Sequence, residues 1–292
     1  PSGLIPLIVA QQKLGGGVMV SASHLGKEYN GLKLVDSSSQ PIAAGSGLEE
    51  IENLIQIEIS PTREKGSVQS KDVLYDYLDY ILKFVDPKII KPLKGVLDAS
   101  GGPINKFSSA IFDQLPCQTT KINFHPRDEF FDHGLNPLLK ESQRETKKEI
   151  LSQKADLGVI WDGDGDRCIF LDEQGELVEP YFITAILAEI IIKKRPGAKV
   201  LHDFRLTWAI DEMAKNNGEF SLVSKAGWSN FLPQMVKEKI LFGGETSGHY
   251  FFSNLLINGA KEENFVFGDG ILPILFILEK LSQTGKKLFQ LA

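Results

Sequence analysis

Short apolar runs and helical apolar stripes alternate along this chain. Apolar runs bounded by glycine, proline or charged residues predict buried strands, whereas apolar residues three and four positions apart predict helices. From residue 93 to the end of the chain the two kinds of segment follow one another. Strands that alternate with helices form parallel or mixed sheets covered by helices, so the pattern predicts an α/β fold.

The βα pattern repeats as two units of similar size, residues 93–176 and 177–292. The predicted strands cover residues 95–98, 120–124, 157–160, 168–171, 199–204, 220–223, 240–242 and 250–252. The predicted helices cover residues 138–153, 181–195, 207–215, 230–239 and 270–286, and one more helix follows the turn at 99–103 and ends near residue 115. The glycines at 101 and 102 favour a structural turn over a phosphate cradle.

Residues 1–92 follow a different pattern. Apolar residues flank a polar loop that contains Asn30-Gly31, which predicts a hairpin over residues 18–35. The other elements expected here are a helix at 49–54, a strand at 55–59, and an amphipathic helix at 70–85 with Ser70 as its N-cap. Pro87 and Pro92 then interrupt the chain, so we place a boundary there. The predicted domains are 1–92, 93–176 and 177–292.

The composition is typical of a folded globular protein and argues against several classes of partner. Hydrophobic residues make up 42% of the chain and charged residues 24%. A net charge of −6 argues against nucleic acid as a partner. No apolar run is long enough to span a bilayer, and residues 3–9 lack the basic flank of a signal peptide. Cys117 and Cys168 have no metal or redox spacing, so we expect a cytoplasmic protein without a membrane partner. The sequence carries no feature that fixes an oligomeric state.

Three aspartates at every second position follow the strand predicted at 157–160. They are Asp162, Asp164 and Asp166, separated by Gly163 and Gly165. Ionised carboxylates this close repel one another and raise one another's pKa, and a bound divalent cation removes that repulsion. Oxygen ligands suit a hard ion such as Mg²⁺, and the glycines allow the loop to bend so that the carboxylates converge. A solvated acidic turn is the alternative, but the regular glycine spacing after a buried strand favours a metal site.

Two further motifs stand out beside the acidic loop Asp162-Gly163-Asp164-Gly165-Asp166-Arg167. They are Ser21-Ala22-Ser23-His24 with Tyr29-Asn30-Gly31-Leu32-Lys33, and Gly244-Glu245-Thr246-Ser247-Gly248-His249. In this order the three motifs resemble the α-D-phosphohexomutase family, most closely its phosphomannomutase/phosphoglucomutase members. That family carries a phosphoserine loop T-A-S-H-N-P followed by Y-N-G-x-K, a metal loop D-G-D-x-D-R and a sugar loop G-E-x-S-G-H. The resemblance covers nearly the whole chain and implies tandem mixed α/β domains of the phosphohexomutase type, each a sheet covered by helices.

The resemblance also implies a role for each matched residue. Ser23 would bear the phosphoryl group and complete a Mg²⁺ site with Asp162, Asp164 and Asp166. Lys33 would act as general acid/base, Arg167 would organise the phosphoserine, and His24 would either orient that loop or cap it. Glu245 and Ser247 would bind sugar hydroxyls, with Arg205 and Trp228 as further substrate contacts, and His249 would support the sugar loop. Trp228 could stack on a sugar face or belong to the core.

The implied reaction interconverts hexose 1-phosphate and hexose 6-phosphate of mannose or glucose, with a hexose 1,6-bisphosphate as intermediate and activator. A phosphoglucosamine mutase is an alternative, because Thr246 at the variable position of the sugar loop does not decide between sugars. The chain departs from the family at Leu25-Gly26, where Asn-Pro is usual, and at Trp228, where a histidine is common. No stretch resembles the R-x-S-x-T-E-P loop of the family's fourth domain, and most of the first domain has no counterpart. A truncated homologue that binds Mg²⁺ or a sugar phosphate with little turnover is therefore a further alternative.

Overall fold

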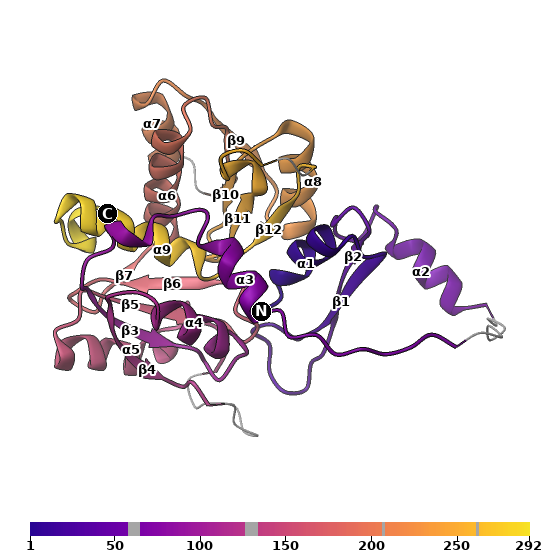
Figure 1. The fold of residues 1–292 in the computed structure, drawn as a ribbon, viewed down its shortest axis with the longest axis horizontal. Helices are drawn as coiled ribbons and strands as arrows, with labels where there is room; N and C mark the ends of the chain where they lie inside the picture. The colour runs from indigo at the N-terminus through magenta and orange to yellow at the C-terminus, as the bar shows by residue number, and fades with distance from the viewer. Residues whose placement is uncertain (58–64, 126–133, 206–207, 261–262) are drawn as a thin grey trace.

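Three sheets and the helices around them make up the part of the chain that the structure describes (Figure 1). The computed structural model describes residues 1–57, 65–125, 134–205, 208–260 and 263–292. One sheet is a two-stranded hairpin and the other two are five-stranded, and helices cover the five-stranded sheets. The predicted α/β fold of tandem mixed sheets covered by helices is confirmed. The division at residues 92 and 176 stays a prediction.

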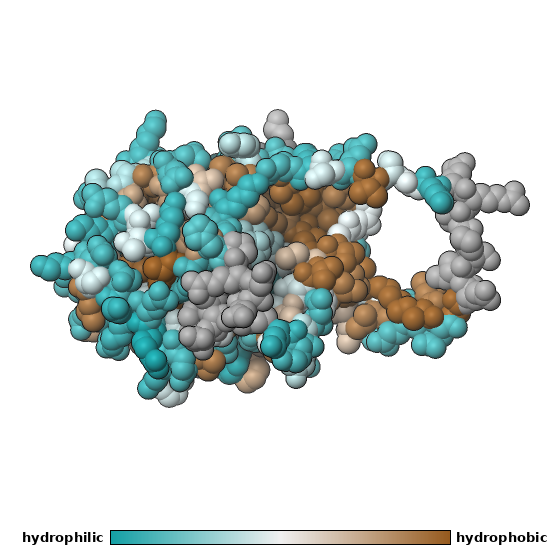
Figure 2. Space-filling view, turned by 90° about the horizontal axis from the view of Figure 1, so that it is seen from below, coloured by the Kyte–Doolittle hydropathy of each residue, from teal (hydrophilic) through white to brown (hydrophobic). Residues whose placement is uncertain are grey.

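The predicted hairpin is confirmed as β1 (Gly16–Val20) paired antiparallel with β2 (Leu32–Asp36). Met19 lies opposite Lys33 in this register, so both side chains point to the same face, toward the rest of the molecule. Val18, Val20 and Leu32 on the other face are each more than 60% exposed. Figure 2 shows a band of apolar residues at this end of the molecule. Leu54, Ile55 and Ile57, farther along the chain, are exposed as well.

The first five-stranded sheet has the strand order β4-β3-β5-β6-β7. Its strands are β3 (Lys94–Asp98), β4 (Gln118–Ile122), β5 (Leu157–Trp161), β6 (Cys168–Leu171) and β7 (Leu177–Val178). β3 runs parallel to β4 and β5, whereas β6 and β7 each run antiparallel to the strand before them. Every residue of β5 is buried, as its continuous apolar run requires. The helices of this part are α4 (Ile104–Phe112) and α5 (Lys140–Gln153).

The second five-stranded sheet repeats this topology. Its strands are β8 (Val200–Asp203), β9 (Ser221–Ser224), β10 (Phe242–Gly244), β11 (Tyr250–Ser253) and β12 (Val266–Gly268), in the order β9-β8-β10-β11-β12. Here too the first three strands in space are parallel and the last two antiparallel. The loop 162–167 joins the third and fourth strands of the first sheet, and the loop 245–249 joins the third and fourth strands of the second. The two motif loops therefore occupy equivalent positions in the two sheets.

Two helices rich in apolar residues, α6 (Pro180–Lys194) and α9 (Leu272–Thr284), lie in the main core cluster. Their apolar residues occur on more than one side and must be covered there, and both helices are largely buried. The remaining helices are α7 (Trp208–Asn216), α8 (Trp228–Glu238), α1 (Leu4–Gln12), α2 (Leu48–Ile55) and α3 (Leu74–Ile81), with short 3₁₀ turns at Pro87–Ile89, Asn254–Leu256 and Leu288–Gln290. None of the helices in the described ranges is both long and apolar enough to cross a membrane.

Several predicted element boundaries are wrong. The helix expected at 70–85 with Ser70 as its N-cap spans only Leu74–Ile81, and the Leu74 N–H donates to the Asp72 side chain instead (3.0 Å). The strand expected at 55–59 is wrong at Ile55, which ends α2, and residues 58 and 59 lie outside the described residues. The strand expected at 120–124 begins and ends two residues earlier, as β4. Three elements were not predicted: α1, β7 and β12.

Candidate active site

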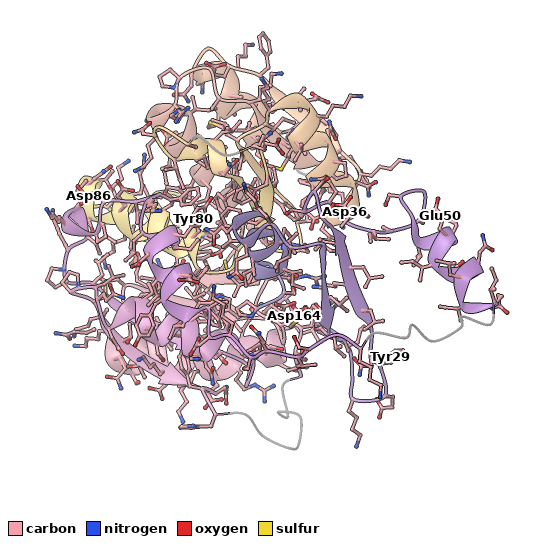
Figure 3. All side chains as sticks on the ribbon, turned by 45° about the vertical axis from the view of Figure 1, so that its right-hand side comes forward. Tyr29, Asp36, Glu50, Tyr80, Asp86 and Asp164 are labelled. Carbon is pink, nitrogen blue, oxygen red and sulfur yellow. The ribbon has the colours of Figure 1, made fainter. Side chains whose placement is uncertain are left out.

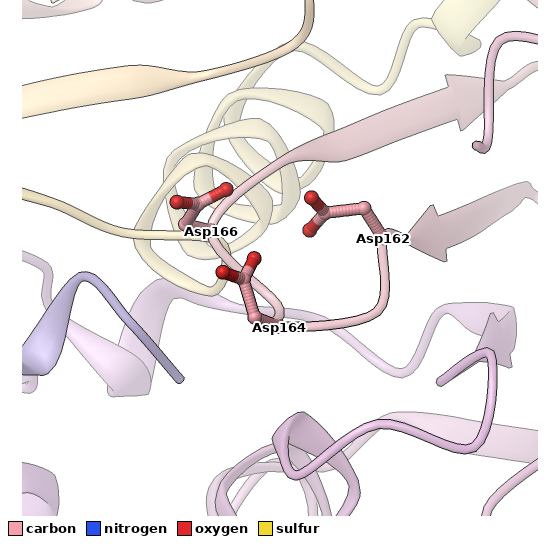
Figure 4. A group of neighbouring side chains, drawn as sticks. All are labelled: Asp162, Asp164 and Asp166. Atoms are coloured by element: carbon pink, nitrogen blue, oxygen red, sulfur yellow. The ribbon is translucent and has the colours of Figure 1, made fainter. Parts of the chain in front are cut away.

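The three aspartates converge on one buried point at the end of β5 (Figure 4). One carboxylate oxygen from each of Asp162, Asp164 and Asp166 lies within 4.8 Å of the other two, and all three side chains are buried. Gly165 permits the bend with a φ of +71°. A Cβ at Gly163 would lie 2.4 Å from the Ser23 carbonyl oxygen, so this glycine lets the serine loop approach the aspartates.

Electrostatics distinguish these carboxylates from one another. Burial, and then the charges of Asp166 and Asp164, raise the pKa of Asp162 well above its usual range. Burial would also raise the pKa of Asp166, but His249 and Lys33 hold it below the usual range. The Lys33 Nζ donates to Asp164 Oδ2 (2.8 Å) and Asp166 Oδ2 (2.6 Å). The cluster is thus buried, and Lys33 pairs with two of its three carboxylates.

This cluster fits a hard divalent cation. The Oδ1 atoms of Asp164 and Asp166 are buried, and neither has a hydrogen-bond partner in the described part of the chain. A buried carboxylate oxygen without a partner is costly. Oxygen-only ligands at this spacing suit Mg²⁺, which satisfies such atoms and offsets the repulsion between the carboxylates.

The serine loop contacts the aspartates directly. The Ser23 Oγ donates to Asp162 Oδ2 (2.9 Å), and the Ser21 Oγ donates to Asp164 Oδ2 (2.9 Å) while it accepts from the Ser23 N–H (2.9 Å). Ser23 adopts a left-handed backbone conformation (φ +54°), which turns its hydroxyl into the cluster. Figure 3 shows Asp164 beside the hairpin, whereas Glu50 of α2 projects away from the body.

Two further side chains lie against Ser23. The His24 Nδ1 is 3.2 Å from the Ser23 Oγ, and its Nε2 is 3.4 Å from the Arg167 Nη1. The Arg167 Nε lies 3.9 Å from Asp162 Oδ2. Burial and the charge of Arg167 lower the pKa of His24, which favours the neutral imidazole. A phosphoryl group on Ser23 would therefore sit beside a guanidinium and a neutral ring.

Ser2 is a member of the site that sequence reasoning misses. Its Oγ donates to Asp166 Oδ2 (2.7 Å) and accepts from the Lys33 Nζ (2.8 Å). The residue is 4% exposed, and its N–H donates to the Asp164 carbonyl (3.1 Å). A serine ahead of an apolar run carries no signal of this kind, because the contact depends entirely on tertiary structure.

The loop predicted to bind sugar, residues 244–249 (here the sugar loop), lies on the other side of the cluster, across His249. The His249 Nε2 is 3.9 Å from Asp166 Oδ2, and its Nδ1 is 3.6 Å from Glu245 Oε2. The Ser247 Oγ donates to the same Glu245 oxygen (3.3 Å), and Glu245 Oε1 accepts from the Gly227 N–H. Burial lowers the pKa of His249.

A backbone bridge joins the two loops. The Cys168 N–H donates to the Gly248 carbonyl (2.9 Å), and Arg167 pairs with His249 in an isolated antiparallel bridge. Gly248 has a φ of +78°, and a Cβ there would lie 2.5 Å from the Ile169 Cδ1. The metal loop and the sugar loop are thus held in contact by main-chain atoms.

The last two predicted substrate contacts lie beside the sugar loop. Arg205 is tied to it through Asp203, which also accepts from Thr246. Trp228 begins α8 directly after Gly227 and packs, partly buried, against a small cluster that includes Phe231. Side-chain contact with a core cluster agrees with the core alternative for Trp228, although the residue stays only partly buried.

The glycine-rich turn at 99–103 supports the metal loop. Its Gly101 and Gly102 N–H groups donate to the carbonyls of Asn123 (2.7 Å) and Ala99 (2.8 Å). A Cβ at Gly102 would lie 2.5 Å from the Gly163 carbonyl. Since these N–H groups have backbone partners, the turn is structural, as the sequence favours.

Sequence models of one family match almost the entire chain. They are described as phosphoglucomutase/phosphomannomutase alpha/beta/alpha domains I, II and III, and match residues 1–61, 75–175 and 179–292. The chain belongs to this phosphohexomutase family. The predicted family resemblance is therefore confirmed.

Individual phosphohexomutases agree with this assignment. Phosphohexose mutases of Xanthomonas campestris are 36% identical over 282 residues, which is 96% of this chain and 60% of theirs. A phosphomannomutase of Vibrio cholerae is 35% identical over 275 residues, which is 91% of this chain and 57% of that protein. The structure of a putative phosphomannomutase from Thermus thermophilus superposes with a TM-score of 0.85 at 24% identity, covering 100% of this chain and 65% of that one, and supports the fold. The chain spans about 60% of the length of the curated relatives it matches.

Proposed function

We propose that this chain carries the phosphoryl-transfer and sugar-binding parts of a hexose phosphate mutase. The protein would interconvert hexose 1-phosphate and hexose 6-phosphate, of mannose or glucose, through a hexose 1,6-bisphosphate. The observation that carries the proposal is the contact of the Ser23 Oγ with a buried three-aspartate cluster, 2.9 Å from Asp162 Oδ2. Relatives named phosphomannomutase and phosphohexose mutase support the reaction class. Its two unpatterned cysteines support a cytoplasmic location.

Asp162, Asp164 and Asp166 would hold Mg²⁺, with the oxygen on Ser23 as a further ligand. A bound Mg²⁺ would neutralise negative charge on the phosphoryl group during transfer. The protein's own cations act at the same place. Arg167 and Lys33 bracket the cluster, and cations that are in place before charge develops stabilise the transition state without further rearrangement.

In the transfer itself, the bond between the Ser23 Oγ and phosphorus breaks, and a bond between phosphorus and a sugar hydroxyl oxygen forms. The sugar hydroxyl loses a proton and the serine oxygen gains one, so the proton count is unchanged. Lys33 would act as the general acid/base. Burial would lower the pKa of Lys33, but Asp166 and Asp164 raise it above its usual value, so the residue begins as the ammonium. It would give a proton to the departing serine oxygen and recover one from the attacking sugar hydroxyl.

Glu245 and Ser247 would bind neighbouring sugar hydroxyls. The carboxylate accepts hydrogen bonds and the serine can both donate and accept, which suits a pair of hydroxyls. Their distance from the aspartates is fixed by His249, which contacts both Glu245 and Asp166. Arg205 would contact the substrate phosphate, and the exposed part of Trp228 a sugar face.

Phosphorylation of Ser23 tests this proposal. After incubation with glucose 1,6-bisphosphate and Mg²⁺, we expect one phosphoryl group per chain, located at Ser23 by peptide mass spectrometry. The Ser23→Ala variant should take up none, whereas Ser21→Ala should still be labelled at Ser23. Label on Ser21, or no label on the wild-type chain, would contradict the proposal.

A further inference from the structure

Asp203, the last residue of β8, is a buried carboxylate that accepts five hydrogen bonds from two separate segments. Its Oδ1 accepts from the Arg205 N–H (2.9 Å) and Nε (3.1 Å). Its Oδ2 accepts from the Arg205 Nη2 (3.0 Å), the Thr246 N–H (2.8 Å) and the Thr246 Oγ (3.0 Å). The residue is 0% exposed. A carboxylate that only stabilises a turn needs just the hydrogen bond from the N–H two residues on, here that of Arg205. The other four hydrogen bonds therefore do more than stabilise the turn.

The contacts with Thr246 connect Asp203 to the centre of the sugar loop. Thr246 lies between Glu245 and Ser247, the two residues proposed to bind sugar hydroxyls. Both polar groups of Thr246 that can donate, its N–H and its hydroxyl, are directed to Asp203. Its side chain therefore holds the loop in place, and the position that varies in the family's motif faces a carboxylate of the protein.

The contacts with Arg205 fix the direction of a guanidinium. The fork formed by Nε and Nη2 meets both carboxylate oxygens, which is the strongest geometry for such a pair. The guanidinium carbon also lies 5.7 Å from the centre of the Phe204 ring. The Arg205 side chain remains 50% exposed, so the donors of its fork that do not face Asp203 are open to a ligand.

We propose that Asp203 is a positioning residue that holds Arg205 and the sugar loop as one unit. Asp203 thereby keeps the Arg205 guanidinium, which would bind phosphate, at a fixed distance from Glu245 and Ser247. In this way the Asp203 carboxylate sets the separation between the phosphate and the hydroxyls of a bound hexose phosphate. The identity of this ligand rests on the proposed function, whereas the positioning itself does not.

The charge of Asp203 is essential to this role. Burial would raise its pKa, but the hydrogen bonds from Arg205 and Thr246 hold the pKa below its usual value, so the carboxylate is ionised near neutral pH. Asparagine has nearly the same shape, but its amide NH₂ would face donors of Arg205 or Thr246. The substitution therefore removes acceptors while it keeps the volume.

Hydrogen exchange of the ligand-free chain tests the positioning role directly. In Asp203→Asn we expect the amides of residues 245–248 to exchange at least about tenfold faster than in the wild type, equivalent to roughly 1.4 kcal/mol. Thr246→Val, which removes only the hydroxyl, should give a smaller increase. It also keeps the proposal testable if Asp203→Asn does not fold. The matched control is Asp172→Asn, a buried turn carboxylate in the other five-stranded sheet that accepts from the Gln174 and Glu176 N–H groups. It should leave residues 245–248 unchanged.

Binding of glucose 1-phosphate, measured by calorimetry, tests whether Asp203 acts through Arg205. Asp203→Asn and Arg205→Gln should each weaken binding at least about tenfold, and the double variant should be little worse than either one, because coupled residues are not additive. A merely structural role for Asp203 would give additive losses.

Unchanged exchange at residues 245–248 in both Asp203→Asn and Thr246→Val would overturn the positioning role, as would additive losses in the binding cycle. If the wild-type chain shows no binding of glucose 1-phosphate, the ligand inferred from the proposed function is wrong, and the exchange experiment still decides the role of Asp203.

Discussion

At the scale of single residues, the buried aspartate cluster makes the stability of the metal-free chain depend on pH. Because the pKa of Asp162 is raised in the folded state by burial and by its two neighbours, its ionisation opposes folding. The contribution of Asp162 to the free energy of unfolding is therefore most favourable below its unfolded pKa of about 3.9. This contribution is lost as the pH rises toward the folded pKa.

We therefore predict that Asp162→Asn stabilises the metal-free chain at pH 7. The gain should shrink as the pH falls toward 4, where the folded carboxyl is neutral and about half of the unfolded carboxyl is neutral as well. Urea unfolding in the presence of a chelator, at pH 4 and pH 7, measures the difference. A variant that is less stable than the wild type at pH 7 would show that the Ser23 and Arg167 contacts outweigh the repulsion.

Asp164 should control the response to metal. Its Oδ1 is one of the partnerless buried oxygens, so it is open to a cation. Mg²⁺ should raise the thermal midpoint of the wild-type chain, since a ligand at 100 times its Kd stabilises by about 2.7 kcal/mol. Asp164→Asn should abolish the rise, and Asp172→Asn should retain it. An unchanged response in Asp164→Asn would contradict the assignment of the metal site.

The sequence predicts the aspartate cluster because a solvated turn rarely carries three acidic residues with a glycine between each pair. It does not predict Ser2 or Asp203. A lone serine and a lone aspartate are common in loops, and their roles arise from partners 164 and 43 residues away. For the same reason the assignments of Arg205 and Trp228 as substrate contacts stay predictions.

At the scale of elements, α1 shows why some helices cannot be predicted from the pattern of apolar residues in the sequence. It is apolar on several sides, has Pro6 in its first turn, and begins at Leu4 after Gly3, which has no side chain to cap it. Such a segment has no single apolar stripe to detect. Tertiary contacts define it: α1 packs against β1 and β12, so it joins the hairpin to the second five-stranded sheet.

Leu7→Ala should therefore destabilise the chain by about 2–5 kcal/mol, because Leu7 is 1% exposed and the substitution leaves a cavity. It should also speed hydrogen exchange in the hairpin, which carries Lys33. Leu14→Ala, at a residue 40% exposed just after α1, is the control and should cost far less. Equal effects of the two changes would mean that α1 does not anchor the hairpin.

The strands next to the acidic loop were predicted well, whereas the strand expected at 240–242 shares only Phe242 with β10, and short edge elements were missed. β5 and β6 follow from apolar runs on both sides of the aspartates. β7 and β12 have two and three residues, too few for any period to appear. The helix expected at 70–85 starts late, at Leu74, where the Leu74 N–H donates to the Asp72 side chain, a contact that only the folded loop reveals.

At the scale of the whole molecule, the two five-stranded sheets place their functional loops at the same topological position and join them there. The Cys168 N–H bond to Gly248 and the His249 contacts to Asp166 and Glu245 make one connected unit of both loops. A ligand that makes one of these loops more rigid should therefore make the other loop more rigid as well.

We predict that Mg²⁺ slows hydrogen exchange at residues 245–249, although none of them is a proposed metal ligand. The protection should disappear in Asp164→Asn, which has the same bridge but a disabled metal site. Exchange that Mg²⁺ slows only in residues 161–168 would show that the loops respond independently.

The bridge has a practical consequence, because one of the chain's two cysteines lies in it. Cys168 is 0% exposed, burial raises the pKa of its thiol well above the usual range, and Cys117 is partly exposed. In a Cys117→Ser variant, a thiol reagent can react only when the junction opens or the chain unfolds. The alkylation rate of Cys168 would then measure how often the two loops separate. It should slow when Mg²⁺ or glucose 1-phosphate is added, and it requires no foreign label.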